Sequence, residues 1–246
     1  GIGRVTAEHL ARAGYAVAVA ARSASQIESV AAEIDALPLA LDVTDADAVA
    51  AAFDAVESEL GAIDLLVANA GHGGDVRPSW EQDPVGWWRT FEVNVLGTHL
   101  CARRATPAMR RRGGGRIVVM ASGAAAFPLA GNDMPIKSAY MASKAAVIRY
   151  AEALAEELRP DGVAVFAISP GMVKTDMTAP VFGALWDEPD VWSPPELTAE
   201  LIAFLDCGAL DRLSGRYIHA ANDDWRSLVD RVDEILERDG HALRLG

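Results

Sequence analysis

The segment SAYMASKAA, residues 138–146, places Tyr140 four residues before Lys144. Lysine is scarce in this chain, which has 3 lysines beside 19 arginines. Residues four apart on a helix share a face, with Cβ atoms about 5–6 Å apart. An ammonium that close favours phenolate over phenol, so we expect Lys144 to lower the Tyr140 pKa from its usual value of about 10. The pair is therefore predicted to exchange a proton with a substrate, unless the two residues merely share an exposed helix face.

Two further polar residues are candidates for the same chemistry. Ser122 ends an apolar run, where its hydroxyl is placed to donate to a substrate oxygen as negative charge develops there. The alternative is a serine that only caps this junction. Asn94 lies inside a helical pattern although asparagine is a poor helix former. The alternative to a role in the site is a solvated amide or a buried amide with satisfied hydrogen bonds. Ser138 and Ser143 lie nearer to Tyr140 in sequence, but we expect both to face elsewhere.

The elements that must position these residues alternate along the chain. Continuous apolar runs predict strands buried on both faces at 63–71, 116–122 and 163–169, and further strands are predicted at 15–21 and 37–43. Helical patterns are predicted at 25–35, 45–60 (started by Asp45), 84–109 and 136–158, with a strand and a helix in 217–240. The alternation predicts one α/β domain over 1–246, a doubly wound parallel sheet with helices on both faces. Ligands are expected at the carboxyl ends of its strands.

Composition narrows the classes of partner. The chain has 246 residues, 51% of them hydrophobic, and a net charge of −13, which disfavours nucleic acid and anionic membranes as partners. Cys101 and Cys207 show no metal-ligand spacing, so no metal site is predicted and both are expected to be buried thiols in a reducing compartment. No apolar run is long enough for a membrane span, so a cytoplasmic protein is expected.

The motifs, taken in order, resemble those of the short-chain dehydrogenase/reductase family over essentially the whole chain. They are GIG at 1–3, DV at 42–43, NAG at 69–71, Asn94 within VNVLG, Ser122, YMASK at 140–144 and PGMVKTDM at 170–177. The resemblance implies a Rossmann-type fold and hydride transfer between a nicotinamide cofactor and a carbonyl or secondary alcohol carbon. Tyr140 would exchange the proton, Ser122 would orient the substrate, and Lys144 would tune Tyr140 and hold the ribose. Asn94 would kink its helix and hold a water near Lys144.

The same resemblance implies a cofactor site. The residues implied to line it are Gly1, Ile2, Gly3, Asp42, Val43, Asn69, Ala70, Gly71, Tyr140, Lys144, Pro170, Gly171, Val173 and Thr175. Relatives that prefer NAD carry an acidic residue at the end of the strand predicted at 15–21, to bind the ribose hydroxyl. Here Ala21 and Arg22 stand at that place, and an arginine pairs well with a 2′-phosphate. We therefore predict NADP(H) in preference to NAD(H), which remains possible.

GIG is only the end of the family's glycine-rich motif. The first strand and the first glycine of that motif do not precede it in this sequence. We expect them to belong to a longer natural chain, and we expect a chain that starts at Gly1 to leave a gap in its sheet. The spacing from Ser122 to Tyr140 is also longer than is usual in the family, with the surplus in 124–137, which is expected to bulge outward.

Substrate recognition is predicted from the segment 176–195, which is rich in proline and aromatic residues. A substrate lid is expected here, and a plain proline-rich excursion is the alternative. Its apolar residues, which include Met177, Phe182, Trp186 and Trp192, favour a hydrophobic ketone or secondary alcohol. His72 and His219 are interpreted as core or surface residues.

The resemblance also implies a homodimer or homotetramer that pairs through helices 84–109 and 136–158. Two other functions remain open at this point. One is an epimerase or dehydratase of the family's extended branch, which uses the same tyrosine and lysine. The other is a dinucleotide-sensing binding protein without catalytic activity.

Overall fold

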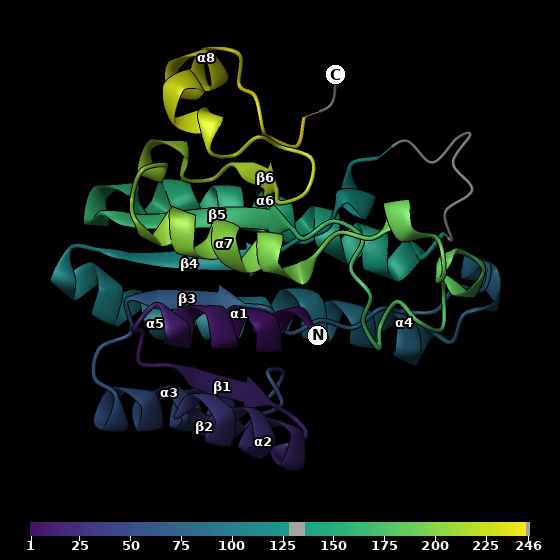
Figure 1. Cartoon of the computed structure of the whole chain (residues 1–246), viewed down its shortest axis with the longest axis horizontal. Coiled ribbons are helices and arrows are strands. Elements are labelled where there is room, and N and C mark those ends of the chain that lie inside the picture. The colour runs from purple at the N-terminus through teal and green to yellow at the C-terminus, as the bar shows by residue number, and fades with distance from the viewer. Residues whose placement is uncertain (128–135, 245–246) are drawn as a thin grey trace.

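Alternating parallel strands and helices build the protein, as the apolar and helical patterns predict (Figure 1). The computed structural model describes residues 1–127 and 136–244. Its strands are β1 (Ala18–Ala21), β2 (Leu37–Ala40), β3 (Leu65–Ala68), β4 (Gly115–Met120), β5 (Val163–Ser169) and β6 (Tyr217–His219). Its α-helices are α1 (Ile2–Arg12), α2 (Ala24–Ile34), α3 (Ala46–Glu59), α4 (Pro84–Phe91), α5 (Gly97–Arg112), α6 (Ser138–Leu158), α7 (Pro195–Asp206) and α8 (Val232–Glu237).

All strand pairs among the described residues are parallel, and they form two hydrogen-bonded groups. β1 pairs with β2, and β3, β4, β5 and β6 follow one another in a second sheet. The register of the second sheet places Val67 beside Val118 and Ile117 beside Val165. The predicted doubly wound α/β class is confirmed, although the division between β1 and β3 interrupts the sheet.

Helices cover both faces of the larger sheet (Figure 1). Ile117, Val119 and Val165 point to one face, where they pack with buried residues of α3, α5 and α6. Val118 and Phe166 point to the opposite face and pack with residues of α1, α7 and the C-terminal segment. Successive side chains of a strand face opposite ways, so this alternation buries both faces, as the continuous apolar runs predicted.

Local signals explain where several helices begin. Asp45 accepts hydrogen bonds from the backbone N–H groups of Asp47 and Ala48, both at 3.0 Å, and so caps α3 as expected. α7 was not predicted, because its start lies in a proline-rich stretch. Pro195 occupies the first position of that helix. A backbone N–H at this position has no partner within the helix, so proline, which lacks the N–H, loses no hydrogen bond there.

The predicted helix 84–109 is interrupted by a π-helical turn at Glu92–Leu96, between α4 and α5. Such turns contain an extra residue and often occur at functional sites. Here the turn contains Asn94, the poor helix former that the sequence singled out.

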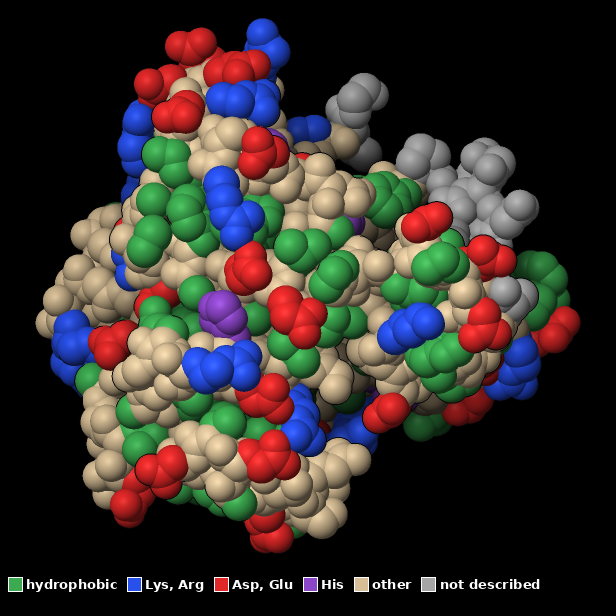
Figure 2. All heavy atoms as spheres, viewed as in Figure 1, with side chains coloured by type: hydrophobic (Ala, Val, Ile, Leu, Met, Phe, Trp, Pro, Cys, Tyr) green, Lys and Arg blue, Asp and Glu red, His purple; other side chains and the backbone are tan. Residues whose placement is uncertain are grey.

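The surface carries both signs of charge. Figure 2 shows acidic and basic side chains interspersed over the face viewed there. Large apolar side chains are exposed along α4, including Val85 at 77% and Trp88 at 57%. No helix in the described part of the chain is long and apolar enough to cross a membrane.

Candidate active site

Tyr140 lies in the first turn of α6, beside the carboxyl end of β4. The Lys144 ammonium is 5.7 Å from the centre of the Tyr140 ring, so the two side chains share one helix face. Lys144 is 4% exposed, and its Nζ donates a 2.6 Å hydrogen bond to the carbonyl of Met120, the last residue of β4. A buried cation is therefore fixed beside the phenol.

Burial determines the charge of this pair. Desolvation raises the pKa of Tyr140 above its ordinary value, although the neighbouring Ser122 hydroxyl lowers it in part. Desolvation also lowers the pKa of Lys144 to about 8. The Tyr140 pKa is therefore raised in this structure, whereas the sequence predicted that it would be lowered, because loss of solvent disfavours both charged forms. At neutral pH the phenol holds its proton.

Ser122 directly follows the buried end of β4. Its backbone is extended (φ −164°, ψ 144°), and its Oγ accepts a 3.2 Å hydrogen bond from the N–H of Ala124 in the short 3₁₀ turn that follows. The serine thus caps the strand–loop junction and also faces Tyr140. Its role in orienting a substrate stays a prediction. Most of the surplus segment 124–137 lies at 128–135, outside the described residues.

Asn94 connects two parts of the site. It is fully buried, and its Oδ1 accepts a 2.7 Å hydrogen bond from the N–H of His72. Its Nδ2 donates to the His72 carbonyl at 3.1 Å and to Ser143 Oγ at 2.8 Å. Ser143 in turn donates to the carbonyl of Tyr140 at 2.8 Å. The amide thereby ties the loop after β3 to the helical turn that carries Tyr140.

These contacts revise the expectations for two serines. Ser143 was expected to face elsewhere, but it is buried in the Asn94 network. Ser138 accepts a 2.7 Å hydrogen bond from Ser79 Oγ. Both amide hydrogens of Asn94 are engaged by the protein. Its role in holding a water stays a prediction.

The start of α1 fits closely against the loop after β3, where Asn69, Ala70 and Gly71 lie. A Cβ added to Gly3 would lie 2.6 Å from Nδ2 of Asn69, so a larger residue would push this loop away. Gly1 is open to solvent, and the first turn of α1 contains no acidic residue. A helix N-terminus next to small residues suits the pyrophosphate of a dinucleotide, so these residues fit such a cofactor.

Asp42 and Val43 hold the end of β2 against the helices. The Asp42 carboxylate accepts hydrogen bonds from Thr44 N–H (3.0 Å) and Thr44 Oγ1 (2.7 Å) and pairs with Arg89 at 2.7 Å. The backbone hydrogen bond from Thr44 is the main cause of the lowered Asp42 pKa. Val43 packs on Gly97, where an added Cβ would lie 2.5 Å from Val43 Cγ2.

The loop after β5, which contains Pro170, Val173 and Thr175, is closed onto the end of the predicted lid. Gly171 has φ +84°, and a Cβ there would lie 2.5 Å from Ser193 Oγ. Ser193 N–H donates to the carbonyl of Met172 at 2.6 Å. The Thr175 N–H donates to Thr178 Oγ1 at 2.8 Å, which closes a turn within the same loop.

Arg22 is exposed and directly follows β1. Burial lowers the pKa of His72, and the positive charge of Arg22 lowers it further. The guanidinium of Arg22 therefore lies near the loop after β3. Arg22 therefore lies at the same edge of the strands as the start of α1.

The sequence model of the short chain dehydrogenase family matches residues 1–185. The chain belongs to the short-chain dehydrogenase family. It is 36% identical over 257 residues to a short chain dehydrogenase of Monascus purpureus (mpl6), covering 100% of this chain and 85% of that protein. It is 39% identical over 172 residues to a 2-dehydro-3-deoxy-L-rhamnonate dehydrogenase (NAD(+)) of Sphingomonas sp. (strain SKA58), covering 69% of this chain and 67% of that protein.

Solved structures agree with this assignment. A short-chain type dehydrogenase/reductase from Mycobacterium marinum superposes with a TM-score of 0.82 and 35% identity, covering 89% of each chain. As a member of the short-chain dehydrogenase family, the protein is an oxidoreductase that uses NAD(H) or NADP(H) and acts on small molecules.

This short-chain dehydrogenase also has site residues that the sequence reading missed. Lys137 is only 8% exposed, and its Nζ lies 5.3 Å from the centre of the Tyr140 ring. A Cβ on Gly73 would lie 3.0 Å from Lys137 Nζ and 3.1 Å from Met177 Cγ. The rarity of lysine is the one signal that could have drawn attention to it.

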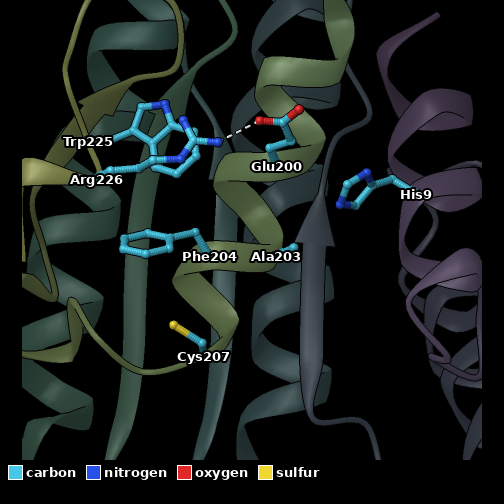
Figure 3. A pocket seen from close by; sticks show the side chains of 7 residues that line it. All are labelled: His9, Glu200, Ala203, Phe204, Cys207, Trp225 and Arg226. Carbon is cyan, nitrogen blue, oxygen red and sulfur yellow. Dashed lines mark hydrogen bonds and ion pairs between the residues drawn. The ribbon is translucent and has the colours of Figure 1, made fainter.

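A separate surface hollow of about 620 Å³ lies elsewhere on the dehydrogenase (Figure 3). It is lined by His9, Glu200, Ala203, Phe204, Cys207, Trp225 and Arg226. The Arg226 guanidinium lies 3.9 Å from the centre of the Trp225 ring and pairs with Glu200 at 2.7 Å. No residue predicted for catalysis or cofactor binding lines this hollow.

Proposed function

We propose that this short-chain dehydrogenase reduces the carbonyl group of an apolar small molecule with NADPH, and that Tyr140 supplies the proton. The observation that carries the proposal is a half-buried phenol that lies beside a buried lysine at the carboxyl end of β4. When bound, the nicotinamide supplies the hydride. The reverse reaction, oxidation of the alcohol, uses the same groups and is favoured as pH rises.

Each residue has a defined part in the proton transfer. Ser122 donates a hydrogen bond to the carbonyl oxygen, which favours the charge that develops there. Tyr140 then donates its proton to that oxygen and becomes a phenolate. Lys144, whose ammonium lies 5.7 Å from the ring centre, stabilises this phenolate by charge. Lys144 and Tyr140 also remain the proposed ribose contacts.

Asn94 acts on this chemistry through position. It holds His72 and Ser143 in place, and Ser143 holds the backbone of Tyr140. We propose that this tie keeps the phenol aligned with the substrate oxygen, since small misplacements of a catalytic group reduce rates strongly.

The NADPH preference rests on Arg22. Its exposed guanidinium follows β1, the place where an acidic residue would select NAD. The relative named for NAD(+) shows that the preference must be measured on this chain. We expect Arg22→Ser to weaken NADPH binding by about tenfold without weakening NADH binding. Arg12→Ser, which removes an exposed arginine from the far end of α1, is the control.

We propose that 176–195 covers the substrate, with Met177 as its nearest apolar contact to Tyr140. Met177 is 38% exposed and packs against the loop after β3 at Gly71 and Gly73. Behind it, the ring centres of Trp186 and Trp192 are 5.2 Å apart. This apolar lining supports a largely apolar substrate.

We also propose that copies of the chain pair through α4, α5 and α6 as a homodimer or homotetramer. Val85, Trp88 and Leu96 expose 77%, 57% and 42% of their surface along α4 and the π-helical turn that follows it. Exposed apolar residues on one side of a helix suit an interface. Cys101 and Cys207 are free thiols, which supports our proposal of a cytoplasmic location. Cys101 is buried as expected, but Cys207 is exposed, so the expectation that both are buried is wrong for Cys207.

The function is tested by following NADPH absorbance over a panel of aldehydes and ketones, with Tyr140→Phe as the control. Turnover that depends on Tyr140 supports the proposal. Cofactor binding without turnover on any compound indicates the sensing protein instead. Interconversion of substrate isomers without net loss of NADPH indicates an epimerase.

A further inference from the structure

The second buried lysine beside Tyr140 is the feature that the proposed reaction does not use. Lys137 is the residue before α6 and approaches the Tyr140 ring to 5.3 Å, compared with 5.7 Å for Lys144. Two of the 3 lysines of the chain therefore flank one phenol. Only Lys144 has an evident part in proton transfer.

The surroundings of the two ammonium groups differ. Lys144 Nζ is directed to the carbonyl of Met120 inside the sheet. Lys137 Nζ lies instead by Gly73 and Met177, between the loop after β3 and the predicted lid. Gly73 is the residue at which a Cβ would meet both groups, at 3.0 Å from Lys137 Nζ and 3.1 Å from Met177 Cγ. The ammonium thus stands on the side of the phenol where a substrate would enter under the lid.

A lysine in this position is unusual in energetic terms. Lys137 is 8% exposed, and burial lowers its pKa. A buried ammonium is unfavourable unless acceptors approach it, and a carboxylate gives the strongest such contact. Its charge also reaches His72, whose pKa it helps to lower. A neutral, apolar substrate would offer no polar contact to this ammonium beside Met177.

Resting on the function proposed above, we propose that Lys137 binds a carboxylate of the substrate, so that the substrate is an oxo acid with an apolar remainder. The carbonyl oxygen lies at Tyr140 and Ser122, and the carboxylate lies at Lys137, a short distance across the same ring. Two fixed polar contacts and an apolar contact at Met177 determine which face of the carbonyl receives the hydride. Lys137 is a specificity residue in this scheme and takes no proton from the reacting atoms.

The test compares oxo acids with their methyl esters as substrates of the full chain and NADPH. The acid-to-ester ratio of kcat/KM is measured for the wild type, Lys137→Met and Lys137→Arg. Methionine keeps the length of the side chain and removes the charge, whereas arginine keeps the charge. Arg212→Met is the charge-matched control, because it removes one exposed cation that pairs with Asp233 of α8.

We expect the ratio to fall by about 10- to 100-fold in Lys137→Met, mainly through KM, as for the loss of a charge-assisted hydrogen bond. Lys137→Arg is expected to restore most of it, and Arg212→Met to leave it unchanged. Binding of a saturated alkanoate of the same length, measured by calorimetry, is expected to weaken by the same factor in Lys137→Met.

The outcomes separate this inference from the proposed function. Turnover of esters and ketones with an unchanged ratio in Lys137→Met overturns the carboxylate site and leaves the reductase intact. A preference for phosphate esters over carboxylates, lost in Lys137→Met, overturns the oxo acid in favour of a phosphorylated carbonyl compound. Failure of the wild type to reduce any carbonyl compound while it binds NADPH overturns the reductase, and the oxo-acid assignment with it.

Discussion

Two walls beside Tyr140 are held by different forces. The α6 wall, made of Asn94, Ser122, Tyr140, Ser143 and Lys144, is fixed by directional hydrogen bonds to backbone groups. The aromatic segment, from Lys174 to Ser193, is held by contacts between aromatic rings as well as by hydrogen bonds.

The rings of the aromatic segment meet edge to face, at 5.2 Å between Trp186 and Trp192 and 6.1 Å between Phe182 and Trp192. Lys174 lies over Trp186 and Trp192 at 5.2 Å and 5.6 Å. Hydrogen bonds fix a side chain to one geometry, whereas aromatic contacts tolerate small shifts. From this difference we expect the α6 wall, with the proposed proton donor, to be the more rigid of the two, and the aromatic segment to adapt to a substrate.

The largest difference between the two walls is expected for substitutions at Tyr140. Tyr140→Phe removes the proton donor and is expected to lower kcat/KM by about 10³-fold, with little change in stability. Trp192→Phe, the matched aromatic change in the other wall, is expected to change kcat less than about threefold. Steady-state kinetics of both variants checks this. Equal losses in the two variants would show that the walls do not divide the work in this way.

Removal of the Asn94 hydrogen bonds is expected to have the next largest effect on activity. Asn94→Ala leaves the buried N–H of His72 and the hydroxyl of Ser143 without this partner. We expect the free energy of unfolding to fall by about 2–4 kcal/mol and kcat/KM to fall by about 10²-fold. Urea unfolding and kinetics measure the two losses.

Thr98→Val is the control for Asn94→Ala, because Thr98 donates only within its own helix, to the Asn94 carbonyl at 2.8 Å. A variant of Asn94 with normal kcat/KM would show that Tyr140 is aligned without the tie.

Because Lys144 is buried in the α6 wall, the free energy of unfolding is expected to depend on pH. Its pKa is about 8 in the folded chain and about 10.4 when exposed. Between these values the unfolded chain binds more protons, so the free energy of unfolding should rise by roughly 2 kcal/mol from pH 8 to pH 10. Below pH 8 the lysine is charged in both states and this contribution does not vary.

Lys144→Met isolates this effect, because the other titrating groups are the same in both proteins. Urea midpoints of the two proteins, followed from pH 7 to pH 10, should converge or cross as the wild type gains stability. Parallel curves would mean that the lysine is solvated in solution and that the wall is more open than described.

The smallest effect is expected in the aromatic segment. Trp192→Ala removes two ring contacts and the 3.0 Å hydrogen bond from Nε1 to the Leu185 carbonyl. KM for the substrate is expected to rise by about tenfold, with kcat nearly unchanged and a loss of about 1–3 kcal/mol of stability. A fall in kcat with constant KM would place this segment in the chemical step instead.

Much of the fold was readable from local patterns. Apolar runs buried on both faces predicted β4 and β5, and a carboxyl capped α3 at the expected residue. α7 was missed because prolines at its start resemble a loop in sequence, although proline is favoured in the first turn of a helix. The division of the strands between β1 and β3 agrees with the gap that was expected in the sheet, because the strand that precedes the GIG motif in the family does not precede it in this sequence.

The sequence by itself determined which side chains meet when their spacing is local. Tyr140 and Lys144 share a face because one helical turn separates them, and Asn94 disturbs its helix because its amide competes with the backbone. Only the tertiary structure decided the charge of these groups and the presence of Lys137 at the site. Both depend on how much water remains once distant segments pack together, and desolvation acts on every group in the cavity, whatever its position in the chain.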